Sequence, residues 1–339
     1  MIALGTARRF LFAPLLAAVA LAPARAAGDE PSPARYAATL TIDGVAGGNV
    51  GDLNAPLASS DVITEALGAD HVAHKHIGGV KYEDVSFSVG ADITPTLAGW
   101  ISGTFAQTFQ RKTVVLTGGA QKRDLFNCLV TEVSFPTMDA ASAARVSLGV
   151  KIKPEYSRIV AAAGAEPAAG PGFAANMFRV ALAGLDTSQI TRVDAFSFKS
   201  KLTENPVGEQ RDYQMEPAKL EVPSVSIYVR PQGAATWLAW HDDFLVKGNS
   251  DDAKEKTGTI EYGPAGTAAL YRVGLGHVGI SRATEVTLAG QRTWKFELYA
   301  ETMSFAAPNA KVEAAPLKGF SVTPRLPVPG KVPSGRRIP

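Results

Sequence analysis

Three closely spaced histidines near the start of the chain are the residues best placed to do chemistry. His71, His74 and His76 could supply imidazole nitrogens to a zinc or copper ion, and Asp70 beside them could add an oxygen. The two remaining histidines lie far away in the second half of the sequence, so a full ligand set is not visible. We therefore interpret the three as incidental histidines on a loop and predict no metal, cofactor or catalytic residue.

Two other segments contain reactive side chains, and both are better explained by packing. The segment Trp240–Phe244 could supply a histidine base and paired carboxylates, but its pattern also fits the polar end of a short helix. Cys128 is the only cysteine and stands among apolar residues, which predicts a core position. The sequence has no phosphate-binding loop, dinucleotide fingerprint, nucleophile elbow or aromatic-basic stripe. We therefore predict that the protein is not an enzyme and binds no nucleic acid.

The first 26 residues have the pattern of a secretory signal peptide. Arg8-Arg9 forms a basic start, an apolar run covers residues 10–22, and Ala24-Arg25-Ala26 places small residues before a cleavage site. We prefer the general export route, because the residues around the arginine pair fit the twin-arginine route poorly. The sequence thus predicts cleavage after Ala26, no transmembrane segment in the remaining chain, and a periplasmic or extracellular protein.

Residues 306–339 form a basic, proline-rich segment. The whole chain carries +2 and residues 1–26 contribute three arginines without an acid. Residues 306–339 carry about +5, which leaves about −6 for residues 27–305. We favour a solvated, disordered tail, and the alternative is an arm that contacts an anionic envelope polymer or a neighbouring subunit. The basic residues of this tail are Lys311, Lys318, Arg325, Lys331, Arg336 and Arg337.

A stretch rich in Ala, Gly and Pro at 161–177 divides the patterned sequence into two halves, 27–160 and 178–305. Each half opens with a short strand, continues through a long irregular stretch, and then alternates between apolar and polar residues. The alternation is clearest in Val85–Val89 and Val225–Val229 and predicts strands with one buried face. We interpret 161–177 as a linker between two domains that share one plan.

Each half also contains one short helical pattern after the alternating strand. In the first half Thr94 can act as the N-cap, with Pro95 at the first helical position and apolar residues at helical spacing behind it. In the second half the corresponding segment follows Pro231 and carries two tryptophans. The apolar helix residues are Leu97, Trp100 and Ile101 in the first half, and Trp237, Leu238 and Trp240 in the second.

The final strands of the two halves match best. Leu148–Ile152 aligns with Trp294–Leu298, and in both segments the apolar residues occupy one face. We also align Leu125–Val130 with Leu270–Leu275, and Glu155 then falls on Glu301. The shared order of features indicates a duplication. We predict a mainly β fold of two tandem small antiparallel β-barrels, each with one short helix, because barrel closure removes exposed sheet edges.

The segment His74–Phe87, HKHIGGVKYEDVSF, resembles a short motif in the tube proteins of contractile phage tails. That motif places a basic residue, a glycine and a Lys-Tyr pair before an alternating strand, and here it includes Gly78, Lys81 and Tyr82. The second half resembles the same family more faintly, keeping Lys219 and the tryptophan-bearing helix without the Gly-Gly-x-Lys-Tyr run. The resemblance covers about 36–158 and 178–305.

The resemblance implies a tube-forming β-barrel that self-associates into stacked six-fold rings and has no catalytic residues. In that family the loop after the first strand takes part in stacking, and here it corresponds to about Val45–Ile77. This chain differs in its predicted signal peptide and in having two units. Closed symmetry then predicts that three copies complete a pseudo-six-fold ring.

Three functions follow from these observations. The first is a structural, tail-tube-like protein that self-assembles into a ring or tube, with other tail-like or envelope proteins as further partners. The alternative is an exported β-barrel binding module that holds an envelope polymer or a small ligand, helped by its basic tail. The third is a metalloenzyme built on His71, His74 and His76, which we favour least.

Overall fold

The computed structural model describes residues 35–65, 72–205, 214–308 and 310. The predicted signal peptide, His71 and most of the predicted basic tail lie outside these residues, so those predictions are neither confirmed nor corrected. Within the described part of the chain, no helix has the length and apolar character needed to cross a lipid bilayer.

Strands make up 57% of the structure and helical segments 10%, which confirms the predicted mainly β fold. The helices are α1 (Pro95–Phe105) and α2 (Ala235–His241), with a 3-10 turn η1 (Pro231–Gly233) before α2 and a π-helical segment η2 (Asp242–Val246) after it. The first strands are β1 (Tyr36–Ile42), β2 (Val45–Asn54), β3 (Ser59–Thr64), β4 (Lys75–Lys81), β5 (Val85–Val89), β6 (Lys112–Gly118), β7 (Gln121–Phe135), β8 (Met138–Asp139), β9 (Arg145–Val146), β10 (Leu148–Lys153) and β11 (Tyr156–Ala161). The later strands are β12 (Phe173–Ala174), β13 (Phe178–Leu182), β14 (Ile190–Val193), β15 (Phe196–Asn205), β16 (Gln214–Glu221), β17 (Val225–Val229), β18 (Lys256–Tyr262), β19 (Tyr271–Leu288) and β20 (Gln291–Ala306).

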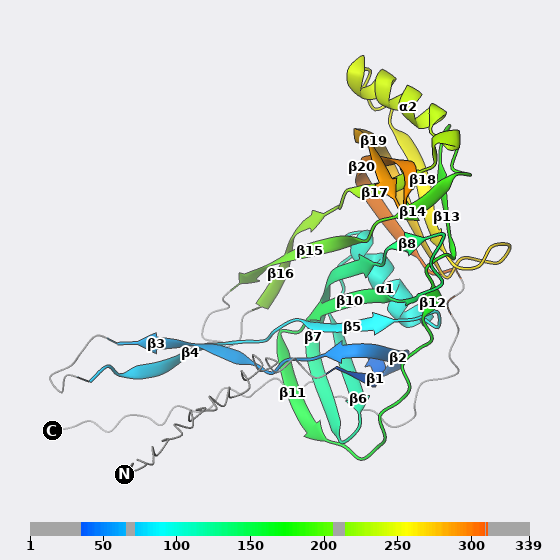
Figure 1. Cartoon of the computed structure of the whole chain (residues 1–339). Helices are drawn as coiled ribbons and strands as arrows, with labels where there is room; N and C mark the ends of the chain where they lie inside the picture. The colour runs from blue at the N-terminus through cyan, green and yellow to red at the C-terminus, as the bar shows by residue number, and fades with distance from the viewer. Residues whose placement is uncertain (1–34, 66–71, 206–213, 309, 311–339) are drawn as a thin grey trace, which may run out of the picture. The chain divides into compact units, whose positions relative to one another are not determined.

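Six strands of the first half close into a barrel (Figure 1). Their order is β1, β2, β5, β10, β7 and β6, and the pairing of β6 with β1 completes the circle. Every neighbouring pair is antiparallel. In β5 and β10 buried residues alternate with partly exposed ones, as the sequence predicts. Because the barrel is closed, each of these six strands has a paired neighbour on both sides.

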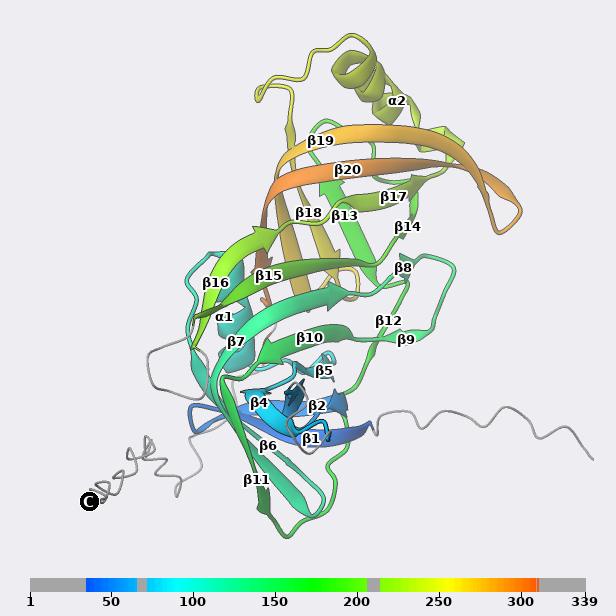
Figure 2. The ribbon, with the colours of Figure 1, turned by 90° about the vertical axis from the view of Figure 1, so that its left-hand side faces the viewer.

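The second half repeats this order but stays an open half-barrel. Its strands follow one another as β13, β18, β19, β20, β17 and β14, which matches β1, β6, β7, β10, β5 and β2. No described pairing joins β13 to β14. The short β14 has four residues where β2 has ten, and it pairs with β8 of the first half instead (Figure 2).

The closing strands repeat in the same register in both halves. Leu148–Ile152 pairs with Val85–Val89, and Trp294–Leu298 pairs with Val225–Val229 in the corresponding positions. The predicted alignment of these strands is therefore confirmed.

The predicted alignment of Leu125 with Leu270 is wrong. Leu125 lies opposite Val114 in β6, and the residue in the corresponding position of β19 is Leu275, opposite Gly258 in β18. Both β7 and β19 are long apolar strands with the same two-residue period, so the sequence pattern does not determine which pairs of residues correspond.

The stretch Val45–Ile77, predicted as a long loop, is mostly strand over the residues that the structure describes, 45–65 and 72–77. β2 is part of the barrel, and β3 and β4 form a hairpin that projects away from it (Figure 1). The glycines of β2 obscured its strand character in the sequence, because glycine is also common in turns. Gly48 has a φ of +90°, whereas Gly47 and Gly51 lie where neighbouring side chains come close. A Cβ atom at Gly47 would come within 2.8 Å of the Leu40 side chain, and one at Gly51 within 2.9 Å of Ala169.

Both predicted helices are present where their residues indicated. In α1 the Thr94 side chain accepts a hydrogen bond from the Leu97 amide at 3.4 Å, which is the predicted N-cap. The predicted apolar residues of α1 are buried. In α2, Trp237 and Trp240 are buried, and the Trp237 indole donates to the carbonyl oxygen of Asp186 at 2.8 Å.

Candidate assembly interface

The hairpin formed by β15 and β16 belongs to the second half but is docked on the first-half barrel (Figure 2). β15 adds to β7 as an antiparallel neighbour, with Phe196 opposite Phe135 and Lys199 opposite Glu132. The hydroxyl oxygens of Ser134 and Ser197 lie 2.8 Å apart across this pair. The two halves are therefore joined by the strand-addition mode that also joins separate β-rich proteins.

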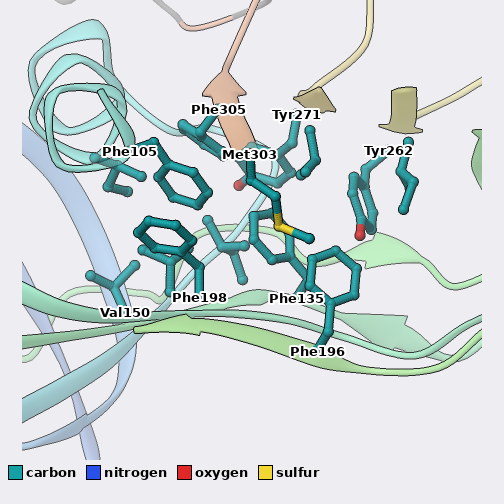
Figure 3. Packing of buried hydrophobic residues seen from close by; sticks show 14 of the residues in the cluster. Phe105, Phe135, Val150, Phe196, Phe198, Tyr262, Tyr271, Met303 and Phe305 are labelled. Carbon is teal, nitrogen blue, oxygen red and sulfur yellow. The ribbon is translucent and has the colours of Figure 1, made fainter. Parts of the chain in front are cut away.

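Aromatic side chains fill the space behind the docked hairpin (Figure 3). Phe198 stacks on Phe105 with ring centroids 3.9 Å apart, and Phe196 stacks on Phe135 at 4.8 Å. Phe305 of β20 adds a third ring, 5.8 Å from Phe105. All five side chains are buried, so the residues on either side of the predicted linker share one apolar core.

Two polar residues of the first half hold the far end of the docked hairpin, and a third positions one of them. Arg111 donates to the carbonyl oxygen of Met215 at 2.5 Å and to the Glu216 carboxylate at 2.8 Å. Glu155 accepts from the Met215 amide at 2.9 Å, and Asn127 donates to the other Glu155 oxygen at 2.8 Å. This group, the first-half clamp, binds a strand backbone together with one acidic side chain.

The second half has a counterpart to each residue of the first-half clamp. The first residue stands immediately before β6 or β18. The second has left-handed backbone, with φ of 52° in β7 and 51° in β19, at a shift in the pairing with β6 or β18. The third lies shortly after Lys153 in the first half and shortly after Tyr299 in the second. Lys153 and Tyr299 hold corresponding positions in β10 and β20. In the order Arg111, Asn127, Glu155, the counterparts are Glu255, His277 and Glu301.

In the second half these side chains form a compact polar group, the second-half cluster. The ligand atoms of Glu255, His277 and Glu301 lie within 4.8 Å of one another. The Nδ1 atom of His277 is 2.9 Å from one Glu255 oxygen, and the Tyr299 hydroxyl donates to the other at 3.0 Å. Burial, reinforced by this bond to Glu255, raises the pKa of Tyr299 to about 12. With a carboxylate where the clamp has an arginine, the cluster suits a cationic group, and its donor set could also hold a divalent cation.

Two surfaces of the repeated plan have no strand partner among the residues that the structure describes. β19 pairs with β18 only as far as Val278, and from Gly279 to Leu288 its pairing is with β20 alone. In the first half, β3 and β4 pair only with each other. Their hairpin exposes apolar side chains to solvent, with exposed fractions of 59% for Val62, 55% for Ile63 and 68% for Ile77.

The sequence-predicted histidines lie on this projecting hairpin. His76 is in β4, opposite Ile63, and its Nε2 atom is 3.5 Å from the Glu65 carboxylate. His74 stands just before β4, where its carbonyl oxygen accepts from the Glu65 amide, and His71 lies outside the described residues. His74 and His76 are exposed, and neither belongs to the compact group of metal-ligand types in the described chain.

The other two segments with reactive side chains are accounted for by local contacts. Asp242 and Asp243 lie in η2 and turn to different partners, Lys247 at 2.6 Å and Asn249 at 2.7 Å. The hydrogen bond from Asn249 lowers the pKa of Asp243, and the nearby Lys254 adds to that effect. Cys128 is buried in β7, and burial raises the pKa of its thiol.

Sequence reasoning did not single out either polar group. One signal was present, since the alignment placed Glu155 on Glu301 and a Lys-Thr pair follows both Arg111 and Glu255. The left-handed residues Asn127 and His277 could not be matched, because β7 and β19 were aligned out of register. Comparison with known protein-family models and with curated proteins gives no match to this chain.

Proposed function

We propose that this protein is a structural, non-enzymatic subunit that self-assembles into a ring or tube, as its resemblance to phage tail-tube proteins implies. The observation that carries the proposal is the docking of β15–β16 on the first half. The equivalent hairpin, β3–β4, and the equivalent edge of β19 have no such contact within the described chain. A chain with one barrel-to-barrel contact inside it thus presents the two surfaces that a second contact would need.

The proposed contact is head to tail. It joins the first half of one copy to the second half of another, so the two surfaces are different and the interface is heterologous. Such interfaces generate a ring when the rotation closes and a filament when it does not. Three chains carry six barrel-like units, which is the number that a pseudo-six-fold ring requires.

The predicted signal peptide adds a cellular context to the proposal. Cleavage after Ala26 would place assembly in the periplasm or outside the cell, with an envelope or tail-like protein as a further partner. Export to the periplasm can be checked by fractionating cells and by sequencing the N-terminus of the recovered protein.

The test of self-assembly is the mass and shape of the chain from Ala27 to Pro339 in solution. We expect light scattering after size exclusion to give a discrete mass that rises with concentration toward three chains. Negative-stain images of the same fraction should contain annular particles. A strictly monomeric mass at concentrations of about 1 mM would refute the proposal, because even weak specific contacts are populated there.

A second function is favoured by one feature of the sequence, the basic segment 306–339. An exported binding module that uses this tail to hold an anionic polymer should lose affinity as salt rises, because screening weakens exposed charge contacts. Removal of residues 311–339, which carry all six basic side chains of this segment, should then abolish retention on immobilised polyanion while leaving β20 intact. Self-assembly that persists without the tail, together with no salt-dependent retention, would exclude this alternative.

A further inference from the structure

We infer that the β3–β4 hairpin of one chain docks on β19 of a second copy, with the start of β4 at the second-half cluster. This inference rests on the proposed self-assembly and specifies the surface through which it occurs. The template is the contact that β15–β16 already makes with β7 and the first-half clamp inside the chain.

The first step is that the two hairpins are the same structure at two places in the chain. In the chain, β3–β4 lies between β2 and β5. The hairpin β15–β16 lies between the corresponding strands β14 and β17. Each cross-strand pair of β3–β4 has a counterpart in β15–β16 the same number of residues further along the chain. Each hairpin also has one shift in register, at corresponding positions. The matched pairs are Ser59–Lys81 with Lys199–Glu221, Ser60–Val80 with Ser200–Leu220, and Thr64–Lys75 with Glu204–Met215.

The second step is that β19 presents the edge that β7 uses. In β7 the docking residues Glu132–Phe135 follow a shift in the pairing with β10. In β19 the residues in the same place are Arg282–Glu285, which follow the corresponding shift in the pairing with β20. Among them Arg282, Thr284 and Glu285 are exposed. Their backbone groups on the side away from β20 are available to another strand.

The third step gives the register of the intermolecular pair. By correspondence with β15 on β7, Ser59 should lie opposite Arg282 and Ala58 opposite Ala283 of the second copy. The aromatic side chain of Phe198, which anchors the internal contact, has the small and exposed Ala58 as its counterpart. Without such an anchor the intermolecular contact should be weaker than the internal one and reversible with dilution.

The fourth step is charge complementarity at the far end of the hairpin. In the internal contact the cation Arg111 receives the acidic Glu216. The counterpart of Glu216 on β4 is His76, and the counterpart of Arg111 is Glu255, so a carboxylate facing an arginine is replaced by an imidazole, a hydrogen-bond donor, facing a carboxylate. Lys75, the counterpart of Met215, adds a cationic side chain at the acidic cluster. A correlated exchange of this kind retains attraction, whereas a change on one side alone would not.

The principal experiment reverses these charges and measures self-association by sedimentation. The variant His76→Glu places a carboxylate against Glu255 and should raise the dissociation constant about tenfold, as expected for loss of a close interfacial pair. The variant Glu255→Arg should do the same. The double variant recreates the Arg111–Glu216 pair between copies and should return to within about threefold of the parent.

The matched control is His74→Glu, which makes the same change on the same hairpin before β4 begins. We expect it to alter the dissociation constant less than about twofold. Thermal unfolding of each variant should match the parent. If Glu255→Arg does not fold, the comparison of His76→Glu with His74→Glu still decides the question.

A cross-linking experiment tests the register directly. Chains carrying Ser59→Cys are mixed with tagged chains carrying Arg282→Cys, and the mixture is oxidised. Residues directly opposite in an antiparallel pair have Cβ atoms about 4.5–5.5 Å apart, which a disulfide can bridge with small adjustments. We expect a mixed dimer that reduction dissolves, and little of it when Thr287→Cys replaces Arg282→Cys. The native Cys128 is buried and should not interfere.

The outcomes separate the inference from the proposed function. A parent chain that assembles but is equally unaffected by all three charge variants refutes this interface and leaves self-assembly standing. A parent chain that is monomeric at every concentration refutes both. Assembly that EDTA abolishes and His76→Glu leaves unchanged would identify a divalent cation as the occupant of the second-half cluster, and it too refutes the hairpin as its partner.

Discussion

The stacked pair of Phe105 and Phe198 offers a quantitative test of how the two halves are joined. Phe198 is 2% exposed, and its ring lies 3.9 Å from that of Phe105 at an interplanar angle of 15°. Replacing it with alanine removes a fully buried ring from a shared core and leaves a cavity between β15 and α1. Substitutions of this kind cost about 3–5 kcal/mol, of which the aromatic pair accounts for about 0.5–1.5 kcal/mol.

This cost is large against a typical stability of about 5–15 kcal/mol, so Phe198→Ala should shift unfolding clearly. We expect the free energy of unfolding, measured in guanidinium chloride by tryptophan fluorescence, to fall by about 3–5 kcal/mol. The control is Ala58→Ser, at the counterpart of Phe198 just before β3, which should change the free energy of unfolding by less than about 0.5 kcal/mol. A loss below about 1 kcal/mol for Phe198→Ala would refute a shared core between the halves.

Three further predictions concern the contacts around this core. Arg111→Ala should lower the free energy of unfolding by about 1–3 kcal/mol in chemical denaturation, because it leaves the clamp's carboxylate without its cation. Glu216→Gln should cost less than about 1 kcal/mol. Equal costs for the two variants would contradict the clamp. Burial alone would raise the pKa of Glu132, but hydrogen bonds from Lys151 and two serine hydroxyls outweigh it, so the pKa lies below the ordinary 4.5. The stabilisation from Glu132 is therefore complete above pH 4.5 and is lost as the pH falls through the lower pKa of the folded state. In acid titrations, Glu132→Gln should lose stability less steeply than the parent over this range. An unchanged slope would contradict this prediction. The buried Cys128, whose thiol pKa burial raises, should resist a thiol reagent at pH 8 until the chain is unfolded, and rapid labelling of the native protein would contradict its placement.

Local patterns predicted those elements whose formation depends on neighbouring residues. The alternation in Val85–Val89 became a strand with one buried face, since successive side chains on a strand point to opposite sides. Thr94 and Pro95 marked the start of α1, because N-cap and first-turn preferences act within a few residues. The order of these elements was enough to predict a mainly β, duplicated fold.

The sequence predicted only part of the candidate interface. The match of Glu155 with Glu301 could be predicted, because the closing strands align without ambiguity. The match of Asn127 with His277 could not, because the apolar run of a long strand repeats every two residues and tolerates a slipped alignment. The glycines of β2 also read as loop, although close packing against Leu40 is what requires Gly47.

The sequence by itself determined the alternating and closing strands, the two helices and the repeated order in which they occur. Only the tertiary structure decided that one unit closes and the other stays open, and that β15–β16 crosses over to β7. It alone brought Glu255, His277 and Glu301 into one cluster. The physical reason is the range of the interactions involved. Side-chain periodicity and capping are local, whereas barrel closure and strand addition depend on backbone pairing between segments far apart in the chain, and the sequence pattern of one strand does not specify its partner.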